Sequence, residues 1–329
     1  MIWLDYYAAG AADKLRAAGL PVKDDVEALA IMSMQAVIAL ARQKGVGTEA
    51  EAAFFSCVHA MTSWALPVQS RESAWEAIAE MSGEDHAEFF RRLHTPRALR
   101  PSPELVASLA GANAPPAPDW WAPLIQGTWY LDIPHRAMTI GEGAEVRAIF
   151  TQPTMKGGIA VACVLTEPGR NAMKGRLAWI MEQDAGVPVV HGHPIEGVDP
   201  GHVRERIGHF IVLLMLYKQV AAKAESVPVP CIDRKAAAGM KPKKLRAKLK
   251  KASFFSVRDL RPPRDNFGRP RTGGGGWKLD HAVEVRGHFR WQAHGPKMSQ
   301  RKLIWIEPHM RGPKEREKRP VIEYLGDRH

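Results

Sequence analysis

Cysteine is scarce in this chain, and the three cysteines lie far apart. Cys57, Cys163 and Cys231 form no C-x-x-C pair, which argues against a disulfide framework and against a zinc ribbon. This usage is typical of a protein from a reducing compartment.

Long apolar runs are also lacking. The longest, residues 210–217, is too short to cross a bilayer. Residues 1–20 carry acidic side chains early and no long apolar segment, so we expect no signal peptide. These absences predict a cytoplasmic protein with no membrane partner.

The common cofactor and metal motifs are missing. The sequence contains no P-loop, G-x-G-x-x-G, G-x-S-x-G, H-E-x-x-H or EF-hand pattern. His191 and His193 flank a glycine, but no second pair of ligands accompanies them. The four glycines at 273–276 lack the Lys-Ser/Thr of a phosphate-binding loop and indicate a hinge. We therefore expect no metal and no cofactor.

Acidic residues are few in the C-terminal part of the chain. Residues 234–329 hold 26 Lys and Arg against 9 Asp and Glu, a net charge of +17. Residues 1–233 hold 20 against 26, a net charge of −6. Such an uneven field favours a polyanionic partner for the C-terminal end, with a merely solubilising tail as the alternative.

The first part of the chain predicts helices. Residues 1–95 have helical spacing and form a predicted helical N-terminal domain. Its helices are expected at 26–44, 49–64, 70–83 and 86–93. The proline-rich residues 96–118 then predict a linker or an extended surface crossing.

Residues 119–233 predict a mixed α/β middle domain. Strands are expected at 128–134, 145–152 and 158–167, and residues 176–183 continue this sheet or pack on it. A helix over 200–224 is apolar on all sides at its centre, which is typical of a buried helix. The fold class that follows is α+β.

Residues 234–329 predict a basic C-terminal region with a β-hairpin at 281–308. The hairpin strands are expected at 281–294 and 302–308. Before them we expect a lysine-rich helix at 241–251, a strand at 254–260 and a mobile basic loop at 261–276.

The first hairpin strand separates apolar from polar residues by simple alternation. Because strand side chains alternate between faces, one face receives Val283, Val285, Gly287, Phe289, Trp291 and Ala293. The other face receives Glu284, Arg286, His288, Arg290, Gln292 and His294, of which only Glu284 is acidic. One face is therefore expected to pack, and the other to meet solvent or a ligand.

The polar face suits RNA. Arginine and lysine neutralise phosphates, and aromatic rings such as Trp305 on the second strand stack on unpaired bases. The predicted nucleic-acid-binding residues are Arg286, His288, Arg290, Gln292, Arg301, Lys302, Arg311, Lys243, Lys244 and Lys248. An ordinary solvated strand is the alternative interpretation.

A metal-independent endoribonuclease is a second hypothesis for the same strand. His288 and Arg290 would then be catalytic, with a second histidine as acid or base. His288 and His294 would be ~20 Å apart on a straight strand, so they could flank one phosphate only across a bulge or from a second strand. We therefore expect a non-enzymatic protein. A protein-binding module for an acidic partner is the third hypothesis.

Three segments resemble, in the same order, the type V-A anti-CRISPR family and its relatives in phages, plasmids and other mobile elements. They are residues 119–134, 209–222 and 285–312. The matching motifs are Pro118-Asp119-Trp120, Tyr130-x-Asp132 and Arg286-Gly287-His288, where Phe289 replaces the tryptophan of the family.

The resemblance implies an accessory protein that lowers expression of a target gene. The anti-CRISPR family is understood to reduce production of a type V effector nuclease by acting on its message during translation. By this resemblance the partners would be RNA or a ribosome-associated complex and a target polypeptide.

Overall fold

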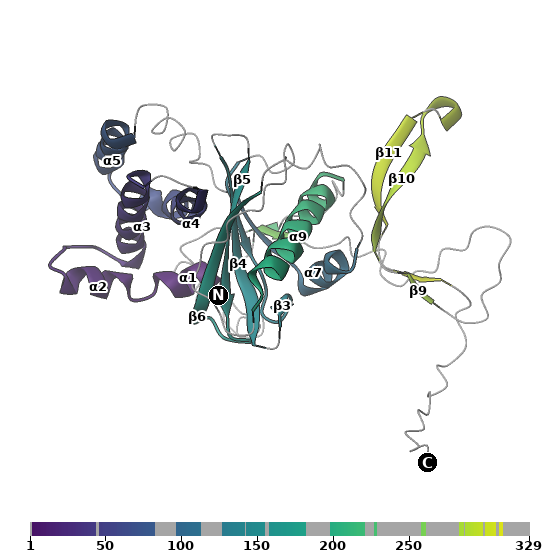
Figure 1. Ribbon diagram of the computed structural model, residues 1–329, viewed down its shortest axis with the longest axis horizontal. Coiled ribbons are helices and arrows are strands. Elements are labelled where there is room, and N and C mark those ends of the chain that lie inside the picture. The colour runs from purple at the N-terminus through teal and green to yellow at the C-terminus, as the bar shows by residue number, and fades with distance from the viewer. Residues whose placement is uncertain are drawn as a thin grey trace, which may run out of the picture.

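A central β-sheet with helices on both faces forms the body of the protein (Figure 1). The computed structural model describes residues 2–43, 46–82, 97–112, 127–141, 143–154, 158–181, 198–220, 227–228, 258–260, 283–285, 287–298, 300–306 and 309–311. The helices and the mixed sheet together confirm the predicted α+β class.

The helices begin and end as follows. They are α1 (Trp3–Ala8), α2 (Ala11–Ala17), α3 (Asp25–Ala41), α4 (Val46–Thr62), the 3₁₀ turn η1 (Ser63–Ala65), α5 (Val68–Ser82), α7 (Pro103–Ala110) and α9 (Pro200–Val220), with a further 3₁₀ turn η3 (Pro296–Met298). Predicted helices at 26–44, 49–64, 70–83 and 200–224 are confirmed, whereas 86–93 and 241–251 lie outside the described residues.

The strands of the main sheet run in the order β6-β5-β4-β2-β1-β8-β7, with β3 paired to β4. They are β1 (Arg97–Pro101), β2 (Trp129–Asp132), β3 (Thr139–Ile140), β4 (Ala144–Pro153), β5 (Ile159–Thr166), β6 (Met173–Met181), β7 (Val227–Pro228) and β8 (Arg258–Leu260). Strand β1 is parallel to both β2 and β8, and the other pairs are antiparallel.

Strand β5 is buried from end to end and supplies side chains to two cores. Ile159, Val161 and Cys163 join the core on one face of the sheet. Ala160 and Ala162 join the core on the other face. A continuous apolar strand is expected where helices cover both faces of a sheet. The apolar sequence of β5 is therefore consistent with a sheet that has helices on both faces.

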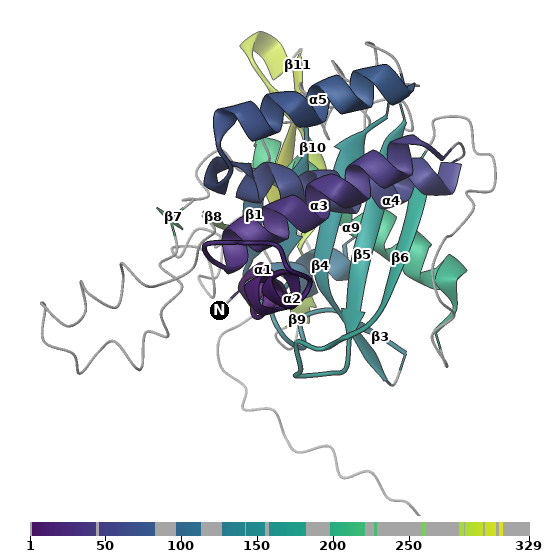
Figure 2. The same cartoon turned by 90° about the vertical axis from the view of Figure 1, so that its left-hand side faces the viewer.

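The N-terminal helices cover one face of the sheet and are not a separate domain. Trp3 of α1 and Phe54 of α4 share one buried cluster with Tyr130 of β2 and Phe150 of β4. Figure 2 shows α3, α4 and α5 lying in front of the strands. The predicted boundary near residue 95 is therefore wrong. A helical apolar stripe predicts burial but does not identify the element that it packs against.

The predicted linker at 96–118 is also wrong where the structure describes it, at residues 97–112. Strand β1 lies inside the sheet between β2 and β8, and α7 follows it directly. The Ser102 hydroxyl accepts a hydrogen bond from the Leu105 N–H at 3.2 Å and caps α7. The prolines are compatible with this because Pro101 ends a strand and Pro103 occupies the first helical turn.

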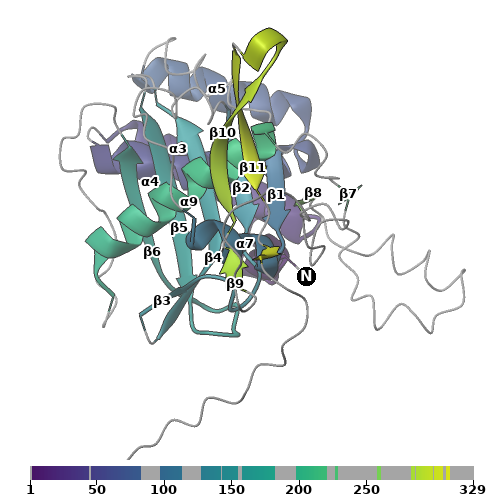
Figure 3. The same ribbon diagram turned by 90° about the vertical axis from the view of Figure 1, so that its right-hand side faces the viewer.

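Helices α7 and α9 cover the opposite face of the sheet (Figure 3). The apolar centre of α9, including Phe210, Leu213 and Leu214, is buried against this face. This confirms the buried helix that the sequence predicted. Among the described residues, no helix is both long and apolar enough to cross a membrane.

The C-terminal region contains two small two-stranded sheets in place of one hairpin. β9 (Val283–Val285) pairs with β12 (His309–Arg311), and β10 (His288–His294) pairs with β11 (Gln300–Ile306). The expected single strand over 281–294 is thus divided before Gly287. Residues 258–260 of the strand expected at 254–260 form β8, and the loop expected at 261–276 lies outside the described residues.

Candidate nucleic-acid interface

The β10–β11 hairpin rises beside α9 and extends beyond the helical body (Figures 1 and 3). Its ladder is regular from His288↔Ile306 to His294↔Gln300, without a register shift. The strands are joined through Gly295, whose φ of 77° favours glycine, and through η3.

The root of the hairpin is anchored by aromatic contacts. The Phe289 and Trp305 ring centroids are 4.8 Å apart, and the Trp305 centroid lies 5.6 Å from that of Tyr217 in α9. Phe289 and Trp305 both pack against the core beneath α7 and α9. Trp305 is partly buried and contributes to this core contact, while its role as a base-stacking surface stays a prediction.

Gly287 allows this close packing. A Cβ at this position would overlap the Trp305 ring and would lie 2.7 Å from Ser108 Oγ of α7. Only a residue without a side chain fits between these groups. The division between β9 and β10 therefore falls where the backbone passes close to α7.

We expect Gly287→Ala to loosen the hairpin. Overpacking of this kind costs about 1–3 kcal/mol, so amide protons of β10 and β11 should exchange faster while those of β4 and β5 keep their protection. The matched control is Gly143→Ala, whose Cβ would meet only Lys174 Nζ at 3.4 Å. Equal exchange rates in both variants and the wild type would show that Gly287 does not fix the hairpin.

The outward face of the hairpin carries polar side chains. Arg290, Gln292 and His294 are exposed, and His288 near the root is partly buried. The register pairs Arg290 with Ile304 and Gln292 with Lys302. Because directly paired residues share a face, this row combines the predicted polar residues with isoleucines from β11.

The remaining predicted residues fall in four places. Lys302 lies in the row of Gln292, whereas Arg301 pairs with Ala293 and lies in the opposite row. Arg311 is exposed on β12. The residues that lie outside the described part of the chain are Arg286, Lys243, Lys244 and Lys248.

The ladder also bears on the two-histidine ribonuclease hypothesis. His288 and His294 occupy the two ends of β10, and the described ladder has no bulge between them. Their separation is ~20 Å from the strand rise per residue. These two histidines therefore do not flank one phosphate.

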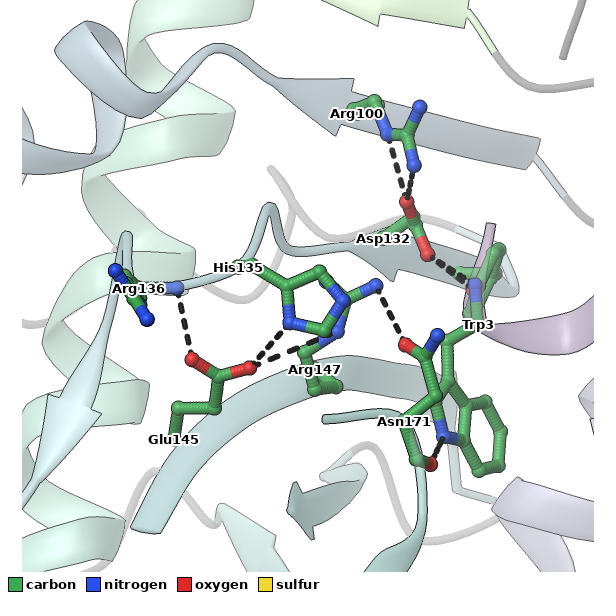
Figure 4. Close-up of polar contacts among 9 residues, drawn as sticks. Trp3, Arg100, Asp132, His135, Arg136, Glu145, Arg147 and Asn171 are labelled. Atoms are coloured by element: carbon green, nitrogen blue, oxygen red, sulfur yellow. Dashed lines mark hydrogen bonds and ion pairs between the residues drawn. The ribbon is translucent and has the colours of Figure 1, made fainter. Parts of the chain in front are cut away.

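A buried ionic cluster was missed from the sequence (Figure 4). Asp132 is fully buried. Its Oδ2 accepts a hydrogen bond from Arg100 Nε at 2.7 Å and forms an ion pair with Arg100 Nη2 at 2.6 Å. Its Oδ1 accepts from the Trp3 N–H and from the Tyr130 hydroxyl, both at 2.8 Å. Asp132 thereby ties α1 and β1 to β2.

Tyr130 remains a donor in this cluster. Burial, and next the Asp132 carboxylate, raises the pKa of Tyr130 well above its ordinary value. The Tyr-x-Asp pattern was the only local signal for this contact. Its other partners, Trp3 and Arg100, are far away in the sequence and could not be assigned from spacing.

Comparison with protein-family models, with curated proteins and with solved structures found no match to this chain.

Proposed function

We propose that this protein is a non-enzymatic accessory protein of a mobile element that binds RNA through its basic C-terminal region. The supporting observation is the exposed row of Arg290, Gln292 and His294 on a hairpin within a region of net charge +17. Cationic and hydrogen-bonding side chains on a projecting strand can follow a phosphate backbone.

The proposed outcome is lower expression of a target gene, as the resemblance to the anti-CRISPR family implies. The RNA would be a message or part of a translation complex. The rest of the molecule, with its net charge of −6 in residues 1–233, would recognise a polypeptide.

The test is binding of a fluorescently labelled single-stranded RNA over a series of salt concentrations. Each phosphate contact contributes about −0.7 to the slope of log K against log salt, so we expect a steep loss of affinity with salt. Arg290→Gln should weaken binding and make the slope less steep by about 0.7, the contribution of one phosphate contact.

The matched control is Lys14→Gln, which removes an exposed positive charge from α2, on the far side of the body from the hairpin (Figure 1). It should bind like the wild type. Affinity that does not depend on salt, or equal losses in both variants, would contradict the proposal. Retention of an acidic protein in place of RNA would favour the protein-binding alternative.

A further inference from the structure

The tip of the β10–β11 hairpin projects away from the body of the protein (Figures 1 and 3). The ladder ends at His294↔Gln300, and the residues between these two ends form the tip, which includes η3. Met298 at the tip is 72% exposed, the largest exposed fraction among the large hydrophobic side chains that the structure describes. The projecting end of the hairpin therefore presents an apolar side chain to its surroundings.

The backbone of the tip holds Met298 in an uncommon conformation. Its φ of 56° lies in the left-handed region, which residues other than glycine, asparagine and aspartate rarely adopt. Its N–H donates a hydrogen bond to the Gly295 carbonyl at 3.1 Å, and the ring of the intervening Pro296 fixes the φ of that residue. Backbone conformations of this kind gather at functional sites. The turn is thus preorganised, which lowers the entropic cost of a contact made by Met298.

The residues around Met298 are cationic or neutral. Residues 294–302 contain one histidine, two lysines and one arginine, and no acidic residue. The register places Lys302 in the row of Gln292 and Arg301 in the opposite row, so each row has a cationic residue next to the tip. A segment with this charge attracts a polyanion. The tip therefore combines an apolar end with cationic flanks.

The size of the apolar group favours nucleic acid over a membrane. Met298 and the exposed Pro296 offer little apolar area, whereas even a whole acyl chain holds a protein only weakly on a bilayer. A step between two stacked bases is a smaller target. Proteins that open such a step insert methionine, proline or another apolar side chain into it. Unpaired bases of RNA are accessible to this contact, and RNA is therefore the favoured partner of the tip.

We propose that Met298 inserts between adjacent unpaired bases of RNA, while Arg290 and Gln292 contact the backbone of the same strand. This contact presupposes the RNA binding proposed above and adds a residue that contacts bases to it. The thioether is polarizable and suits the face of an aromatic ring. Because every base has such a face, the ligand is defined as unpaired, stacked RNA of any sequence.

The probe is a single-stranded oligoadenylate with 2-aminopurine at its centre, a base whose fluorescence rises when it leaves its stack. We expect the wild-type protein to raise this fluorescence on binding. Met298→Gln replaces the thioether with a polar group of similar length, so it should abolish the rise and weaken binding by about tenfold. The slope of log K against log salt should keep its wild-type value, because no phosphate contact is lost. Met298→Leu should restore both the rise and the affinity.

Met173→Gln is the matched control. Met173 begins β6 and is 47% exposed, so this variant makes the same chemical change on the body of the protein. It should bind the probe as the wild type does. Amide exchange in β10 and β11 should be the same in Met298→Gln as in the wild type, which shows that the hairpin itself is intact.

The RNA interface and the base contact fail in different ways. If Arg290→Gln weakens binding and Met298→Gln does not, the base contact is overturned and the RNA interface stands. A wild-type complex without a rise in 2-aminopurine fluorescence has the same meaning. Absence of any binding by the wild type would overturn both. Sedimentation of the wild type, but not of Met298→Gln, with phosphatidylserine vesicles would assign the tip to a membrane and overturn the base contact.

Discussion

Asp132→Ala should destabilise the protein by about 3–5 kcal/mol, because it removes one partner of a buried ion pair. Arg100 would lose the carboxylate oxygen that its Nε and Nη2 both contact, and the Trp3 N–H and Tyr130 hydroxyl would lose their acceptor. Buried donors left without acceptors carry the full cost of their desolvation. Urea denaturation followed by circular dichroism measures the free energy of unfolding directly.

The control for this variant is Asp13→Ala. The Asp13 side chain is 85% exposed and its ion pair with Arg16 spans one helical turn, so its loss should cost no more than about 1 kcal/mol. Similar free energies of unfolding for the two variants would show that Asp132 does not hold α1 and β1 to β2.

Phe54→Ala should cost about 3–5 kcal/mol, and its effect should be coupled to that of Phe150→Ala. Phe54 belongs to α4 and Phe150 to β4, and their ring centroids are 4.7 Å apart in an edge-to-face arrangement. Both side chains are fully buried. An aromatic pair contributes about 0.5–1.5 kcal/mol beyond its buried area, which a double-mutant cycle should detect.

This cycle tests whether the N-terminal helices and the sheet form one cooperative unit. We expect one unfolding transition for every variant, with non-additive free energies in the double variant. Additive effects, or two separate transitions, would mean that the helical layer unfolds independently of the sheet and would restore a domain boundary.

The sequence predicted most elements of the central body. Helical spacing identified α3, α4, α5 and α9, and the apolar character of α9 predicted its burial. Period-two alternation also identified the two faces of β10, since Phe289 packs inward while Arg290 and Gln292 are exposed. These are local properties, set by which side chains share a face of one helix or one strand.

The candidate sites were predicted unevenly, because their partners come from different ranges of sequence. Arg290 and Gln292 are two residues apart on one strand, and simple alternation found them. His135 lies in the turn after β2, whereas Glu145, the carboxylate that it contacts in Figure 4, belongs to β4. Trp3 and Asp132, which share a hydrogen bond, are 129 residues apart in the sequence. No spacing rule joins such residues, because only the packed sheet brings them together.

Composition, charge distribution and local periodicity were determined by the sequence alone, and so were the α+β class and the basic C-terminal region. Tertiary structure decided which elements share a core. It placed the N-terminal helices on the sheet, inserted residues 97–101 as an internal strand and turned Trp305 toward α9. The physical reason is that an apolar face must be buried somewhere, and its own residues do not specify the surface that buries it.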